Sequence, residues 1–348
     1  MLAVVILFLS ACKGKQPDTK RAEPNQAGQN LAGQAQEGSL TSPDRKADVK
    51  EMQQEGTLEG NATIGEMHGL KGNKAVQWRW EKDVNAKHNL NGYRSLWGVE
   101  DSPVHSQTYI ESKLAADVTS VAGTWEKEDG TLYLLCRNKK QNVLTYIVAK
   151  KNGKVLRGGS IDFAKCYKKI YGKTFKRLYI YEEMVRVDKK GHMVAIYHAN
   201  GKWGILTIQT KTGKITGKKL KTGNWCLQDD GTPLLLPDYN RVTTYEGSFQ
   251  FETYACHGKT LYKVDLAGDI YKGTTDDVNN LEKISTGGIY TADPAITDDI
   301  ELINQEYFLS DCCVSGDGTK LYVRYWKGTD EHFEDKDEVF YMVSYKLQ

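Results

Sequence analysis

Acidic residues cluster at three places in the sequence, and their carboxylates are the groups that could most directly do chemistry. Two carboxylates roughly 5–10 Å apart can serve as acid and base in a glycosidase, and several carboxylate oxygens together can bind calcium. The clusters are Asp276-Asp277, then Asp298-Asp299 with Glu301, and Asp335 with Asp337 and Glu338. Acidic clusters in loops are more often solvated surface. The sequence therefore favours a protein without catalytic residues and leaves a hydrolase as the alternative.

Other chemistries lack their motifs in this chain. There is no HExxH and no CxxC motif, so nothing in the sequence predicts a zinc site. Gly172-Lys173-Thr174 has Tyr167 where a phosphate-binding loop needs its first glycine. The 47 basic and 45 acidic residues leave a net charge of +2, which provides no basic coat for nucleic acid. We therefore expect no metal, no cofactor and no nucleic-acid partner.

Six cysteines follow Cys12, and an even number is typical of proteins with disulfides. The candidate disulfides are Cys136–Cys166 and Cys226–Cys256. Each would close a loop of about 30 residues. The alternative is that these cysteines are small buried hydrophobic residues. The other two, Cys312 and Cys313, are neighbours on a predicted strand and should point to opposite faces.

A basic segment without any acidic residue runs from residue 165 to residue 179. Its cations are Lys165, Lys168, Lys169, Lys173, Lys176 and Arg177. Aromatic and aliphatic residues alternate with them at helical spacing, which predicts an amphipathic helix inserted between two sheets, with its aromatic stripe packed on the domain. Such a face could bind an anionic partner, such as lipopolysaccharide phosphates, an acidic lipid or an acidic protein. The alternative is an ordinary solvated face.

A repeated turn indicates the elements that position these residues. The tripeptide Asp-Gly-Thr begins at Asp129, Asp230 and Asp317, and a looser copy begins at Asp188. In such a turn the glycine accepts a positive φ, the aspartate accepts hydrogen bonds from its own backbone, and a strand follows. Second hairpins are expected at Asn152-Gly153, at Thr212-Gly213 and near Gly268. Two hairpins per unit predict four-stranded antiparallel sheets.

The four aspartates of these turns lie 59, 42 and 87 residues apart, and the last interval is close to two units of about 43. A repeat of about 40–50 residues with four strands is typical of a β-propeller blade, which must stack on its neighbours to cover both faces. We predict an all-β fold over residues 66–348, a propeller of about five to seven four-stranded blades. The alternative is a β-sandwich or two β-domains. The last expected strand, 339–347, lacks a partner that residues 75–80 could supply.

The pentapeptide at residues 211–215, KTGKI, is similar to the outer turn of quinoprotein-like propeller blades. This resemblance covers a few residues per blade. It implies the propeller fold and nothing about activity.

The chain begins with a short apolar run that ends in a cysteine. The eight residues from Leu2 to Leu9 are too few to span a bilayer but suit the core of a signal peptide. The run ends in Leu9-Ser10-Ala11-Cys12, which resembles the lipobox of bacterial lipoprotein precursors. The resemblance implies that residues 1–11 are a signal peptide and that the Cys12 sulfur carries lipid, including palmitate. Lys13 in place of an aspartate favours the outer membrane if the host has two membranes.

The next segment has the composition of a flexible linker. No Phe, Tyr or Trp occurs from residue 9 to residue 77. Residues 12–65 therefore cannot bury enough apolar area to offset their chain entropy, and we predict a disordered tether. A lipid, a tether and a folded domain together describe a cell-envelope protein attached to the membrane.

These features favour an envelope lipoprotein whose propeller binds a protein or an envelope polymer, because propellers present broad faces made of loops. One alternative is a hydrolase or lyase that acts on glycans with paired carboxylates. The other is a protein that neutralises a toxin in the periplasm.

Overall fold

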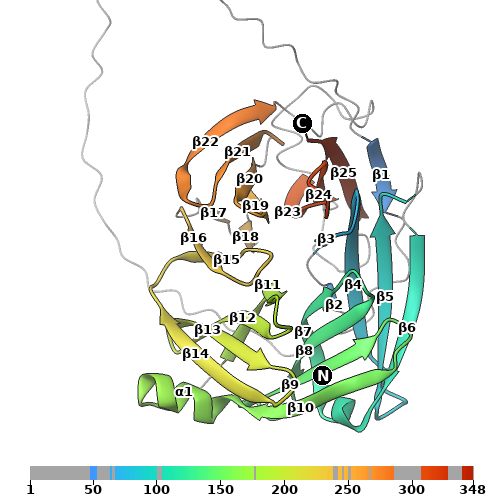
Figure 1. Ribbon diagram of the computed structural model, residues 1–348, viewed down its shortest axis with the longest axis vertical. Coiled ribbons are helices and arrows are strands. Elements are labelled where there is room, and N and C mark those ends of the chain that lie inside the picture. The colour runs from blue at the N-terminus through green and yellow to red at the C-terminus, as the bar shows by residue number, and fades with distance from the viewer. Residues whose placement is uncertain are drawn as a thin grey trace, which may run out of the picture. The chain divides into compact units, whose positions relative to one another are not determined.

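The computed structural model describes residues 48–52, 63–64, 67–99, 104–175, 178–237, 242–244, 247–249, 252–265, 268–285, 307–327 and 339–347. All of them belong to one compact unit, Ser42–Gln348. Antiparallel strands form this unit, and Figure 1 shows their sheets arranged in a ring. No helix among the described residues is long and apolar enough to cross a membrane. The predicted all-β propeller fold is confirmed.

Five sheets of four or more strands form the blades of the ring. The first blade contains β2 (Thr63–Ile64), β3 (His68–Leu70), β4 (Lys74–Lys82), β5 (Asn89–Trp97) and β6 (Val104–Glu111). The second contains β7 (Val118–Glu126), β8 (Thr131–Asn138), β9 (Val143–Lys150) and β10 (Val155–Asp162), and a short 3₁₀ helix, η1 (Lys113–Ala115), precedes it. The third contains β11 (Leu178–Val187), β12 (Met193–Ala199), β13 (Lys202–Gln209) and β14 (Lys214–Leu220).

Two hairpins lie between the third and fourth blades (Figure 1). They are formed by β15 (Asn224–Leu227) with β16 (Pro233–Leu236), and by β17 (Val242–Thr244) with β18 (Gly247–Phe249). The fourth blade contains β19 (Glu252–His257), β20 (Thr260–Asp265), β21 (Ile270–Thr274) and β22 (Asp277–Ser285). The fifth contains β23 (Tyr307–Val314), β24 (Lys320–Lys327), β25 (Val339–Lys346) and β1 (Asp48–Met52).

The fifth blade is completed by a strand from early in the chain. β1 pairs antiparallel with β25, with Asp48 opposite Ser344 and Met52 opposite Phe340. The expectation that residues 75–80 supply this strand is wrong, because they lie in β4 of the first blade. Both β1 and β2 lie within residues 12–65, where the sequence predicts a tether. Composition missed them because pairing with the free edge of a strand uses backbone groups and needs no apolar side chain.

The ring is also closed near its inner strands, where the first and fifth blades exchange hydrogen bonds. The backbone N–H of Gly316 donates to Leu70 O at 2.9 Å, and that of Asp317 donates to Gly72 O at 3.0 Å. The Tyr322 hydroxyl donates to Asn73 O at 2.6 Å. These bonds fix the first blade against the fifth independently of β1.

Apolar side chains fill the space between neighbouring sheets. Trp78 and Trp80 of the first blade pack with Leu132 and Leu134 of the second, and comparable clusters join the other neighbours around the ring. The fit is close: a Cβ on Gly92 would lie 2.5 Å from the Trp80 ring. Each blade thus buries both faces near the centre of the ring, as a propeller requires.

The predicted aspartate turns connect the innermost strand of a sheet to the next strand. A carboxylate oxygen of Asp129 accepts the Thr131 N–H at 2.9 Å, and the aspartates at 188, 230 and 317 accept equivalent bonds at 2.8–3.0 Å. In the fourth blade this turn is His257-Gly258-Lys259, with φ of 59° at the glycine and no aspartate. The missing aspartate explains the interval of 87 residues in the sequence pattern.

Candidate functional site

The inner strands β3, β11, β15, β19 and β23 surround a cavity of about 50 Å³ at the middle of the ring. A space of this size is large enough to hold ordered water. The polar side chains that line it include His68, Arg186, Asp229 and Asp311. Their bonding decides whether any of them is available for chemistry.

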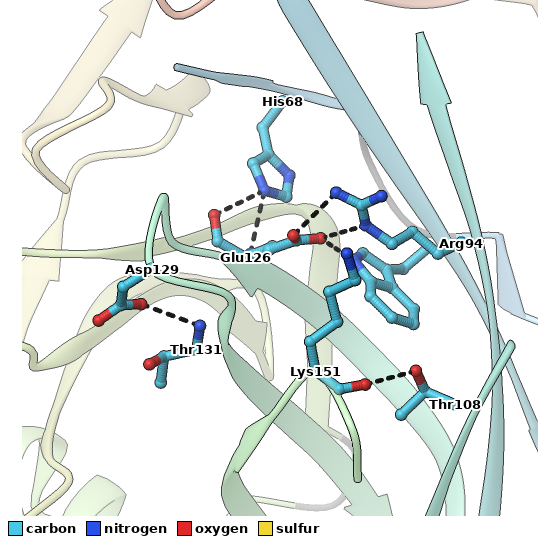
Figure 2. A network of polar contacts seen from close by, with 8 residues as sticks. His68, Arg94, Thr108, Glu126, Asp129, Thr131 and Lys151 are labelled. Carbon is cyan, nitrogen blue, oxygen red and sulfur yellow. Dashed lines mark hydrogen bonds and ion pairs between the residues drawn. The ribbon is translucent and has the colours of Figure 1, made fainter. Parts of the chain in front are cut away.

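A buried ion pair joins the first and second blades (Figure 2). Glu126 at the end of β7 accepts two bonds from Arg94 of β5, from Nε at 2.7 Å and from Nη2 at 2.9 Å. Trp78 Nε1 donates a third bond to Glu126 at 2.9 Å. Glu126 and Arg94 are 4% and 5% exposed, so a bidentate pair is needed to compensate for their lost hydration. Glu126 therefore anchors the second blade to the first.

His68 is bound into the same network. His68 Nε2 lies 3.0 Å from the backbone N and 3.2 Å from the backbone O of Glu126, and the tautomer of the ring decides which of the two bonds forms. The imidazole also stacks on Trp125, with ring centroids 4.2 Å apart and planes 17° from parallel. Figure 2 shows His68 above Glu126 and Arg94 to the right, at the carboxylate end of the Glu126 side chain. These contacts hold His68 in place between β3 and β7.

A second buried ion pair stabilises the fifth blade. Arg324 Nε lies 2.9 Å from Asp311 Oδ1, and the other carboxylate oxygen accepts the backbone N–H of Met67 at 3.1 Å. Both side chains are less than 10% exposed. Asp311 thus ties β23 to the residue before β3, and its charge is already matched.

Asp229 is the carboxylate of the cavity lining that solvent reaches, whereas Asp311 is buried. It follows β15, lines the cavity and is still exposed to solvent. Desolvation by the surrounding protein raises its pKa, and the positive charges of Arg186 and His257 oppose that shift. Arg186 itself lies over the Trp125 ring, 4.9 Å from the centroid. One carboxylate of raised pKa can act as a general acid, but a glycosidase of the usual kind needs two.

The acidic clusters predicted from the sequence do not line this cavity where the structure describes them. Asp276 is exposed in the turn between β21 and β22 and pairs with Lys259 at 2.8 Å, and Asp277 begins β22. The clusters at residues 298–301 and 335–338 lie outside the described residues. In the part of the chain that is described, no group of three His, Cys, Asp or Glu side chains could hold a metal ion.

None of the six cysteines that follow Cys12 forms a disulfide with another described cysteine. Cys136 lies in the core between the first and second blades, where burial raises its pKa to about 12, whereas Cys166 of the helix packs in the next cluster. Cys226 and Cys256 share one cluster and both line the cavity. Cys312 and Cys313 pack in different clusters, as expected of neighbours on a strand. Cys12 lies outside the described residues.

The predicted amphipathic helix is present as α1 (Phe163–Tyr171), between β10 and β11. Asp162 caps its first turn by accepting the Lys165 N–H at 3.1 Å. Gly172, with φ of 71°, ends it in the left-handed conformation that a side chain would disfavour. Phe163 and Tyr167 are buried between the second and third blades, so the aromatic stripe packs on the domain as predicted.

The opposite side of α1 presents its lysines to solvent beside the outermost strand of the third blade. A Cβ on Gly217 of β14 would lie 2.5 Å from Ile170, so helix and strand touch directly. Lys219 of β14 lies over the Tyr171 ring, with Nζ 5.3 Å from the centroid. We call the resulting surface the lysine face; it comprises Lys165, Lys168, Lys169, Lys173 and Lys219, all exposed. Lys176 and Arg177 of the predicted patch lie outside the described residues.

Comparisons with known proteins identify no family for the chain. No protein-family model and no curated protein matches it. Among solved structures, the major allergen Mala s 1 of Malassezia sympodialis aligns with a TM-score of 0.43 at 10% identity, over 79% of this chain and 90% of that chain. A GH43 β-1,3-galactosidase with galactodeoxynojirimycin gives 0.38 at 9% identity, over 84% and 93%. An α-L-arabinofuranosidase of Podospora anserina with cellotriose gives 0.36 at 10%, over 85% and 94%. Likenesses this distant concern the course of the chain and carry no conclusion about activity.

Proposed function

We propose that this chain is a lipid-anchored protein of the bacterial cell envelope whose propeller is a binding module, with the lysine face as its docking surface for an anionic partner. The lipobox at residues 9–12 supports the anchor. The matched charges of Glu126 and Asp311 support binding over catalysis, because neither carboxylate is free to exchange a proton with a substrate.

The observation that carries the proposal is the accumulation of exposed cations on α1 and β14. Four lysines of the basic segment and Lys219 share one surface, and the nearby Asp162 is engaged in capping the helix. Lys168 and Lys169 also lie in the last helical turn, where cations favour the helix dipole. One or two lysines are enough for this interaction with the helix dipole. The remaining cations add to an electrostatic field that attracts phosphate or carboxylate groups.

Edge protection offers a competing explanation for lysines on β14, because outer strands often carry lysine to prevent pairing with other chains. The other blades share the feature weakly or not at all. The outer strands β6 and β10 contain no lysine and the outer strands β22 and β1 contain one each, whereas β14 contains three. The excess on the third blade therefore favours a binding role.

The test compares charge reversal on two blades. The Lys165→Glu/Lys168→Glu/Lys169→Glu variant should bind vesicles containing phosphatidylglycerol about a hundredfold more weakly than the parent chain, since each lysine near an anionic surface contributes about 1 kcal/mol. The matched control, Lys139→Glu/Lys140→Glu/Lys154→Glu, changes three exposed lysines of the second blade. Equal losses in both variants, or no loss in either, would contradict the lysine face as a docking surface.

The anchor has its own test. Replacing Cys12 with Ala should abolish metabolic labelling with palmitate and release the protein from membranes. Persistent labelling would place the lipid elsewhere or exclude it.

A glycan hydrolase is the second candidate, and the raised pKa of Asp229 is the observation in its favour. Purified protein incubated with labelled oligosaccharides should leave their lengths unchanged if the propeller only binds. Shortening that disappears in Asp229→Asn would establish catalysis instead.

A further inference from the structure

The outer part of the first blade has a sheet face made only of polar and aromatic side chains. Its residues lie in register on three adjacent strands, β4, β5 and β6. Arg79, Tyr93 and Gln107 form one row, and Glu81, Asn91 and Tyr109 form the next. We call these six residues the polar block. Closer to the centre of the ring, Ala75 and Trp97 of the same face pack against the fifth blade.

Contacts within the polar block hold its side chains in place. The Arg79 guanidinium lies 4.8 Å from the centroid of the Tyr93 ring, and its Nη2 lies 3.2 Å from Glu81 Oε1. Gln107 lies directly opposite Tyr93 in the register of β5 and β6. Tyr109 on the outermost strand is 55% exposed and is among the largest exposed hydrophobic side chains that the structure describes. The block therefore combines an open aromatic ring with fixed hydrogen-bonding groups.

Charge and composition narrow the class of ligand. Arg79 and Glu81 cancel, so the block carries no net charge and has no advantage for an anion such as a phosphate. It contains no aliphatic side chain, whereas the centre of a protein–protein interface is largely apolar. Its phenol, amide, guanidinium and carboxylate groups both donate and accept hydrogen bonds. A neutral polymer rich in hydroxyl groups suits a surface that has no net charge, no aliphatic side chain, and groups that both donate and accept hydrogen bonds.

We propose that the polar block binds a neutral glycan chain. Tyr109 offers its ring to the C–H face of a sugar unit, where burial of apolar surface is favourable. Gln107 lies beside it on the same strand, is exposed, and exchanges hydrogen bonds with sugar hydroxyls. A further row, in which Ser95 Oγ lies 3.1 Å from His105 Nδ1, extends the same face toward the centre of the ring. Three rows span roughly 13 Å along the strands, enough for two or three sugar units.

This site is separate from the lysine face and does not depend on it. The lysine face lies on the third blade and binds through net charge, whereas the polar block lies on the first blade and has none. Glycan binding should consequently survive high salt and the Lys165→Glu/Lys168→Glu/Lys169→Glu variant. Failure of one proposal leaves the other standing.

The experiment titrates the full chain with neutral hexasaccharides: β-1,4-glucan, β-1,3-glucan, mannan, xylan and chitin fragments, each followed by calorimetry. We expect at least one to bind. Tyr109→Ala should then weaken its affinity about tenfold, the size of an aromatic contact of about 1.4 kcal/mol. Tyr109→Phe should retain affinity within about twofold, because the ring remains. The control Leu156→Ala removes a side chain that is 42% exposed on β10 of the neighbouring blade and should change nothing.

Several outcomes would overturn the proposal. Binding of none of the hexasaccharides would exclude the neutral-glycan site, as would binding that is equally weakened by Tyr109→Ala and Leu156→Ala. Polygalacturonate is titrated alongside the neutral chains, and a preference for it over all of them, with loss in salt, would assign an anionic ligand instead. Folding of each variant is checked by its urea transition, so a loss of affinity cannot be mistaken for a loss of structure.

Discussion

The two faces of the first blade are built by the same three strands and have opposite chemistry. One face carries Ile110 and Arg94 into the contact with the second blade, where both are buried. The other carries the polar block toward solvent. Because side chains alternate along a strand, each buried residue has a neighbour in the block: Tyr93 precedes Arg94, and Tyr109 precedes Ile110. Substitutions at adjacent positions should therefore separate stability from binding.

The largest effect is expected from the buried ion pair. Glu126→Gln leaves the Arg94 guanidinium buried without a counter-charge, so the free energy of unfolding in urea should fall by about 3–5 kcal/mol. Replacing both partners, as in Glu126→Leu/Arg94→Met, should recover part of this loss, since no charge is then left uncompensated. A loss below about 1 kcal/mol in Glu126→Gln would show that water reaches the pair and that the two faces differ less than their burial indicates.

The adjacent pair Tyr109 and Ile110 gives the sharpest comparison. Ile110 is fully buried, and Ile110→Ala should lower the free energy of unfolding by about 2–5 kcal/mol through the cavity it leaves. Tyr109→Ala, one residue earlier, should change stability by less than about 0.5 kcal/mol, as is usual for surface positions. Urea titrations of both variants measure the difference. Similar losses at the two positions would mean that Tyr109 is packed and not available to a ligand.

Much of the difference between the buried face and the polar face of the first blade is visible in the sequence. The alternation of Val76, Trp78 and Trp80 with polar residues predicts a strand with one buried face. The Asp-Gly turns predict hairpins, and four of them are confirmed by the hydrogen bonds of their aspartates. Strand alternation and turns depend on residues two to four positions apart, so they can be predicted without knowledge of the tertiary fold.

The contacts that could not be predicted from the sequence depend on pairing between distant segments of the chain. Glu126 meets Arg94 across 32 residues, and Lys219 joins a helix that ended at Tyr171. The closing strand β1 has no hydrophobic pattern to reveal it, because β25 holds it through backbone groups. The polar block was missed for the same reason: its rows appear only when β4, β5 and β6 are placed in register.

The smallest effect is expected from the exposed ion pair of the polar block. Arg79 and Glu81 are 23% and 34% exposed, so solvent screens their attraction, and a double-mutant cycle with alanine should give a coupling of about 0.2–1 kcal/mol. Raising the salt to 1 M should reduce this coupling further, because the screening length then falls to about 3 Å. The cycle for Arg94 and Glu126 should remain nearly unchanged in the same salt, since ions do not enter the space between the blades. If the Arg79–Glu81 coupling were equally insensitive to salt, the polar block would be covered by protein, and no glycan could reach it.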